Sequence, residues 1–129
     1  MTDKVSSDLI LQIGEMILSD GEFEEVTWDS IGLVATFFEG SREITGYAFK
    51  DDGRFEPAIP WEAGEVLDKL ERLSEHMEAT DQGAFVQCLI QLKKPDLALR
   101  LQFEHEDPKR WSVAAAIANQ GTFSGMLRP

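Results

Sequence analysis

The sequence predicts an α+β fold of two layers, in which helices pack on one face of an antiparallel sheet of about five strands. Two long segments carry apolar residues every three or four positions, which is typical of a helix that packs by one face. Five shorter segments alternate between apolar and polar residues or are apolar throughout, as strands are. The predicted order is α-β-β-β-α-β-β plus a C-terminal segment, and this order favours helices gathered on one side of a sheet.

The two predicted helices cover residues 2–18 and 62–79. The first ends at Ser19-Asp20-Gly21, where Gly21 suits a left-handed C-terminal turn. Gly14 costs about 1 kcal/mol relative to alanine inside a helix, and we take it as a sign of close packing on the sheet. The apolar faces consist of Leu9, Ile10, Ile13 and Ile17 in the first helix and of Val66, Leu67, Leu70, Leu73 and Met77 in the second.

The five predicted strands cover residues 26–38, 44–49, 54–59, 84–92 and 97–104, with residues 22–25 as an acidic lead-in and residues 39–42 as a hairpin turn. Asp51-Asp52-Gly53 is a second turn, where Gly53 can take a positive φ. Pro57 has no N–H for a sheet ladder, so the third strand should lie at an edge. The segment 84–92 is apolar on both faces, which predicts a strand inside the sheet.

The last strand alternates clearly, with Leu97, Leu99, Leu101 and Phe103 on one side, and it stops at His105-Glu106-Asp107-Pro108. Two continuations are open. Asp107 can cap a helix within residues 107–119, with Pro108 at its first position. Alternatively, residues 111–113 are extended and a helix follows later.

The charge is the least ordinary property of the chain, which at 129 residues should form a single domain over residues 1–129. It has 24 acidic against 12 basic residues, a net charge of −12. Such a field disfavours direct binding of nucleic acid or of an anionic membrane and favours a basic partner. The alternative is that the charge only keeps the protein soluble.

No pattern of catalytic or metal-binding residues is evident. His76 and His105 lack further ligands at metal-binding spacing, and no glycine-rich loop precedes a helix. We therefore expect no cofactor, no metal site and no enzymatic activity, but an acidic binding module. The single cysteine, Cys88, excludes an internal disulfide and lies in an apolar run as a buried thiol. The absence of a signal peptide and of a long apolar span predicts a cytoplasmic protein.

Residues 28–111 resemble the YezG-like immunity, or antitoxin, proteins of bacterial polymorphic toxin systems. The matching features are the strand VATFFEG, the aromatic strand ITGYAF and, after the second helix, the strand that runs into LQFEHEDPKRW. The closing Leu127-Arg128-Pro129 is also similar, whereas residues 113–125 are richer in alanine than such proteins tend to be. Relatives act as immunity proteins, including against toxins of contact-dependent growth inhibition. The resemblance implies neutralisation of a cognate toxin, often a nuclease.

The candidate partner-binding residues are Glu104, Glu106, Asp107 and Trp111, because carboxylates beside an aromatic suit an interface. The alternative is that Trp111 fills the core and the acids are solvated. Asp51 and Asp52 are a second candidate, with a solvated hairpin tip as the plain alternative.

A rival interpretation is an acidic chaperone of the type III secretion class, which holds an effector before export. Such chaperones are usually dimers, and a dimer interface would need an exposed apolar patch, from Trp61 or from the alanine-rich tail. We expect a monomer, which would weigh against this rival.

Overall fold

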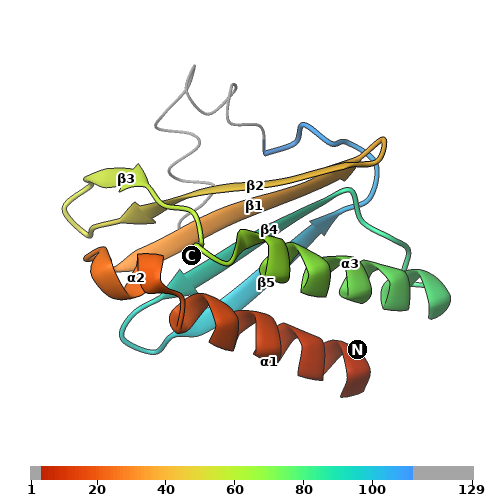
Figure 1. The fold of residues 1–129 in the computed structure, drawn as a ribbon, viewed down its shortest axis with the longest axis horizontal. Coiled ribbons are helices and arrows are strands. Elements are labelled where there is room, and N and C mark those ends of the chain that lie inside the picture. The colour runs from red at the N-terminus through yellow and green to blue at the C-terminus, as the bar shows by residue number, and fades with distance from the viewer. Residues whose placement is uncertain (1–3, 112–129) are drawn as a thin grey trace.

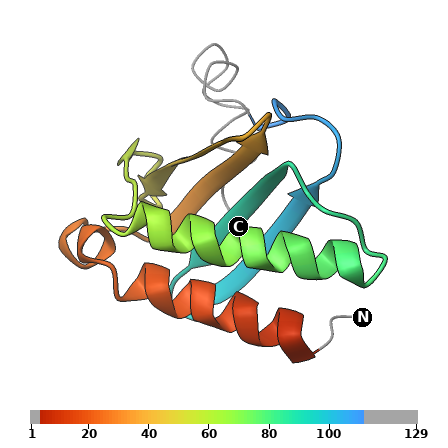
Figure 2. The ribbon, with the colours of Figure 1, turned by 45° about the vertical axis from the view of Figure 1, so that its right-hand side comes forward.

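The structure, a computed structural model, describes residues 4–111. Its elements are α1 (Lys4–Leu18), α2 (Gly21–Glu25), β1 (Ser30–Phe38), β2 (Ser41–Phe49), β3 (Phe55–Pro57), α3 (Ala63–Ala79), β4 (Gln87–Lys93) and β5 (Ala98–Glu104). The strands form one antiparallel sheet in the order β3-β2-β1-β4-β5. Helices α1 and α3 pack side by side against one face of it (Figure 1, Figure 2). The predicted α+β fold is confirmed.

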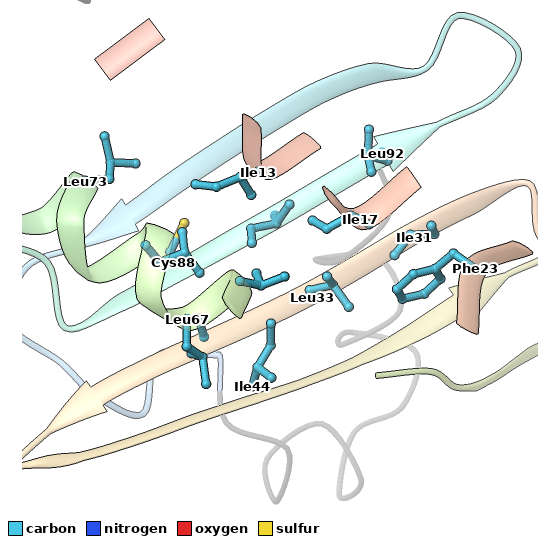
Figure 3. Packing of buried hydrophobic residues seen from close by; sticks show 14 of the residues in the cluster. Ile13, Ile17, Phe23, Ile31, Leu33, Ile44, Leu67, Leu73, Cys88 and Leu92 are labelled. Atoms are coloured by element: carbon cyan, nitrogen blue, oxygen red, sulfur yellow. The ribbon is translucent and has the colours of Figure 1, made fainter. Parts of the chain in front are cut away.

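The main core lies between the two long helices and the sheet. Ile31, Leu33 and Ala35 of β1 point toward the helices, as their alternation predicts, and all three are buried. The predicted apolar faces of α1 and α3 meet them, with Ile13, Ile17 and Leu73 fully covered (Figure 3). Each fully buried side chain of this size contributes about 1.5–3 kcal/mol relative to an exposed one, so this layer stabilises most of the described fold.

Helix α1 crosses the sheet close to its β5 edge. A Cβ on Gly14 would lie 3.1 Å from Cδ2 of Leu99, which confirms that this glycine marks close helix–sheet packing. Helix α3 lies over the other half of the sheet, where Arg42 of β2 reaches Asp68 and Glu71. The two helices together therefore span the sheet.

A smaller apolar cluster occupies the opposite face of the sheet. It consists of Val34, Phe49, Leu89 and Trp111, with Tyr47 half-buried beside them. Apolar groups on both faces explain why β4 is buried from Gln87 to Leu92, and the prediction that this strand is interior is confirmed.

Asp20 lies just beyond Leu18, where the first helix ends as predicted, and it joins α2 to the segment before α3. Its carboxylate accepts backbone N–H groups from Glu22 at 2.9 Å, Trp61 at 2.8 Å and Glu62 at 2.9 Å, and its residue is only 4% exposed. It therefore caps α2 and also fixes the chain just before α3. Gly21 is the first residue of α2 and has no positive φ, so the left-handed turn predicted there is wrong; the Trp61 ring covers it instead.

Several strand boundaries differ from the prediction. The first strand begins at Ser30, not at residue 26, and the predicted acidic lead-in, residues 22–25, is part of α2. The hairpin turn is tighter than expected: Glu39 and Gly40 both take positive φ (51° and 80°), and β2 already begins at Ser41. Positive φ at both central residues is the geometry of a two-residue turn.

The other differences lie at the hairpin between β4 and β5. Strand β4 runs from Gln87 to Lys93, later than the predicted 84–92. Leu97 has a positive φ of 55° and precedes β5, so it lies in the turn and not on the strand's apolar face. Gly53 takes the expected positive φ, and β3 with Pro57 is at the sheet edge as predicted.

In the described range, 4–111, no helix combines the length and apolar character needed to cross a membrane. Residues 108–111 form a turn, and the rest of the predicted C-terminal helix lies outside the described residues.

Candidate functional site

The two acidic segments selected from the sequence lie at opposite corners of the sheet. Asp51 and Asp52 come just after Phe49. Phe49 pairs with Ser30 of β1, which pairs in turn with Lys93 of β4, so these three residues mark one end of the strands. Glu104 pairs with Gln87 at the other end of the strands, on the far edge of the sheet. The fold therefore does not bring the two candidates together, and they are separate surfaces.

Glu104 organises the turn that follows β5. Its Oε2 accepts the backbone N–H groups of Glu106 and Asp107, both at 3.1 Å, and its Oε1 accepts from the Arg110 guanidinium at 3.0 Å. The two backbone donors, together with the guanidinium, lower the pKa of the Glu104 carboxyl. Glu104 thus shapes the acidic turn and is itself only partly exposed, at 19% of its side chain.

Glu106 and Asp107 are the exposed acids of this turn. Asp107 also accepts the backbone N–H of Lys109 through Oδ1 at 2.9 Å, so it is held in place locally. We call residues 104–107 the β5 acidic turn. Its geometry presents two carboxylates to solvent on a backbone that Glu104 fixes.

Trp111 is buried, with 3% exposure, in the cluster with Val34, Phe49 and Leu89. Its backbone N–H donates to Gln87 Oε1 at 3.0 Å, and the Arg110 guanidinium lies 4.6 Å from its ring centre. The indole therefore packs in the smaller apolar cluster and is not itself a contact surface. Because it is buried, it holds the chain that follows the β5 acidic turn against the sheet.

The Asp51–Asp52 turn is also held by its own contacts. Asp29 Oδ2 accepts the Asp51 N–H at 2.7 Å, and Asp52 accepts the backbone N–H and Nε of Arg54 at 3.0 Å and 2.7 Å. The hydrogen bond from the Arg54 backbone, followed by its side chain, lowers the pKa of Asp52. Both carboxylates are solvent-exposed.

A shallow groove runs beside this turn, between the end of α2 and the β2–β3 hairpin. Its volume is about 830 Å³. The lining mixes charges of both signs with apolar groups: Glu25, Val26, Thr27, Ala48, Lys50, Gly53, Arg54, Phe55 and Glu56. Such a mixed lining selects no particular ligand chemistry.

Helix α3 carries a third acidic surface, which the sequence pattern showed only as the polar side of an amphipathic helix. Its outward carboxylates repeat every three or four residues: Glu62, Glu65, Asp68, Glu71, Glu75 and Glu78. Arg42 reaches Asp68 at 2.6 Å and Glu71 at 3.0 Å, and these bonds raise the pKa of the guanidinium. Arg42 therefore partly neutralises the negative charge in the middle of this row. Its two partner carboxylates stabilise the packing of α3 on the sheet, and the row also offers a contact surface.

The described residues hold no group of three or more His, Cys, Asp or Glu side chains arranged to bind a metal ion. His105 is exposed and its Nδ1 lies 2.9 Å from the Ala84 carbonyl, which makes it a donor in a loop contact. Cys88 is fully buried, and burial raises the pKa of its thiol far above the ordinary value.

No protein-family model matches this sequence, and a search of curated proteins finds no similar sequence.

Proposed function

We propose that this protein is an immunity protein that binds a cognate bacterial toxin and neutralises it, and that the toxin is a basic protein, a nuclease. The observation that carries the proposal is the net charge of −12 on a chain of 129 residues. Nucleases bind a polyanion and tend to be basic at the cleft. An acidic protein is attracted to such a cleft over distances of a Debye length and is repelled by the nucleic acid itself. The resemblance of residues 28–111 to YezG-like immunity proteins supports the same function.

The β5 acidic turn is the contact surface that we assign first. One partner surface of ordinary size cannot cover both corners of the sheet, because a typical interface buries only about 800 Å² on each side. Glu106 and Asp107 are exposed on a backbone that is fixed from two sides, by Glu104 and by the buried Trp111. A fixed backbone limits the entropy lost on binding. The Asp51–Asp52 turn is the second candidate.

Three charge reversals separate these surfaces: Glu106→Lys in the β5 acidic turn, Asp51→Lys in the hairpin turn and Glu65→Lys on α3. Each changes the net charge by the same amount, so long-range attraction falls equally and any further loss is local. We expect Glu106→Lys to raise the Kd for the toxin at least tenfold more than the other two variants. A larger loss with Asp51→Lys, in folded variants, would move the contact surface to the hairpin turn.

The function itself is tested in cells with the product of the neighbouring reading frame. We expect that expression of this product alone arrests growth, that co-expression restores growth, and that the two proteins purify as a stoichiometric complex. A neighbouring product that is harmless and exported, but still bound, would contradict the immunity function.

That last outcome would favour the second candidate function, an acidic secretion chaperone. The observation in its favour is an exposed apolar pair between β3 and α3, where Trp61 is 62% and Ile59 is 42% exposed. Exposed large apolar side chains on one connecting segment suit a protein contact. Light scattering distinguishes the two, because the chaperone is expected to be a dimer and the immunity protein a monomer.

A further inference from the structure

We propose that the outer edge of β5 is the place where the partner docks, by adding one extended strand of its own as a sixth strand of the sheet. This inference rests on the proposed function and names the surface through which the toxin is held. The added strand would carry apolar side chains on the side that faces α1 and basic side chains near its ends.

Within residues 4–111, the two edges of the sheet differ in how readily they can accept a further strand. Strand β3 has three residues and contains Pro57, which cannot donate a hydrogen bond to a further strand. Strand β5 has seven residues without proline or glycine, and within residues 4–111 it pairs with β4 alone. An unbulged edge strand of this length presents a row of N–H and C=O groups that can pair with another strand.

Side chains beside this edge provide apolar contacts for an added strand. Leu99, Leu101 and Phe103 face the helices but are only half-buried, because β5 is the last strand under α1. Gly14 of α1 lies directly against Leu99. Helical spacing places Leu11 and Leu18, one turn before and one turn after, on the same side of α1 as Gly14.

Leu11 is 61% exposed, although it is a large aliphatic residue on a helix that packs well elsewhere. A further strand lies about 4.8 Å beyond β5, so its inward side chains would reach under α1 toward Leu11 and Leu18. The exposure of Leu11 in the free protein is then explained, because the partner covers it.

The charges around the edge match a basic segment. Exposed carboxylates stand at the start of β5 (Asp96), at its end (Glu106) and above it on α1 (Glu15). Basic side chains also stand nearby: Arg100 lies on the face of β5 away from the helices, and Lys93 and Lys94 adjoin the start of the strand. At its other end, Arg110 is paired with Glu104. The edge thus continues into the β5 acidic turn, and the two form one surface.

The test uses the full-length protein and the toxin that it neutralises in the growth assay. Hydrogen–deuterium exchange is measured on the free protein and on the complex. We expect amides of alternate residues in β5, whose N–H groups point outward, to become protected by the toxin. Amides of β3 at the other edge should not change.

A pair of matched variants on α1 provides the second readout. Leu11→Lys places a cation beside the edge. Val5→Lys makes the same change in charge on the side of the helix opposite Gly14, at a residue that is 51% exposed. We expect Leu11→Lys to raise the Kd at least tenfold and Val5→Lys less than twofold, with both variants folded by circular dichroism.

The outcomes separate the inference from the function. Protection in β5 together with the loss in Leu11→Lys supports the edge as docking site. Neutralisation by the wild type, with unprotected β5 amides and wild-type affinity of Leu11→Lys, would overturn the docking edge and leave the immunity function standing. Failure to neutralise the neighbouring product would overturn the immunity function and this inference with it.

Discussion

Asp20 connects segments that lie far apart in the sequence. A single buried carboxylate accepts three backbone N–H groups, from the first turn of α2 and from the segment that leads into α3. Two of these donors are more than 40 positions away in sequence, so no local pattern identifies the contact. The fold thus depends on a buried polar residue that the spacing of apolar residues in the sequence does not reveal.

We predict that Asp20→Ala lowers the free energy of unfolding by about 3 kcal/mol, because three partly buried N–H groups lose a charged acceptor. Urea denaturation followed by circular dichroism measures the change. Asp8→Ala is the control: Asp8 pairs with Lys4 at the surface of α1, and such a pair is worth about 0.5 kcal/mol or less. Equal effects of the two substitutions would show that Asp20 is not a structural junction.

Glu104 gives a prediction for the dependence of stability on pH. Its pKa is lowered in the folded state by the backbone N–H groups of Asp107 and Glu106. A lowered pKa stabilises the fold above the unfolded value, about 4.3 for glutamate, and this contribution is lost as the pH falls through the folded value.

We therefore expect Glu104→Gln to be less stable than the wild type at pH 7 and the difference to shrink as the pH falls from about 5 toward 3. Thermal unfolding at each pH measures it, with Glu75→Gln, exposed on α3, as a control expected to stay close to the wild type. A difference that does not vary with pH would mean that the hydrogen bonds of the charged form are not its source.

At the scale of elements, helix α1 and strand β5 are fitted to each other at Gly14. We predict that Gly14→Val costs about 2 kcal/mol of stability, because the larger side chain must displace Leu99 in a packed layer. Gly64→Val in α3 is the matched control, since a Cβ there meets nothing within 4 Å. Urea denaturation should find the control variant close to the wild type, and equal losses would refute the close contact.

The periodicity of the sequence predicted the two long helices and the number of strands, because long apolar repeats report burial on one face. It missed α2, whose five residues contain only Phe23 as a buried anchor and whose start depends on the Asp20 cap. It also assigned Ser41 and Arg42 to a turn, because nothing in the residue types reveals that Glu39 takes a positive φ.

The sequence pointed to the acidic and aromatic candidate residues, but it could not show which of them lie side by side on one surface. Strand order decides which acids are neighbours, and the order β3-β2-β1-β4-β5 separates Asp51 from Glu106 by the whole sheet. Burial of Trp111 depends on Val34 and Phe49, which come from strands far earlier in the chain. Such contacts are visible only once the sheet is assembled.

At the scale of the whole molecule, the net charge of −12 should control how fast a basic partner is captured. We predict that raising the salt concentration from about 0.05 M to about 0.5 M lowers the association rate constant for the toxin at least tenfold, because the Debye length shrinks to a few ångströms. The dissociation rate constant should change less. Surface plasmon resonance measures both, and an association rate that ignores salt would contradict electrostatic capture.

The proposed immunity function requires that this protein bind and inhibit its toxin in a defined ratio. The most direct measurement is a titration of the purified toxin's activity, nuclease activity if it is one, with increasing amounts of this protein. We predict a linear fall to complete inhibition at one protein per toxin molecule. Undiminished activity at a large molar excess of the folded protein would contradict the immunity function.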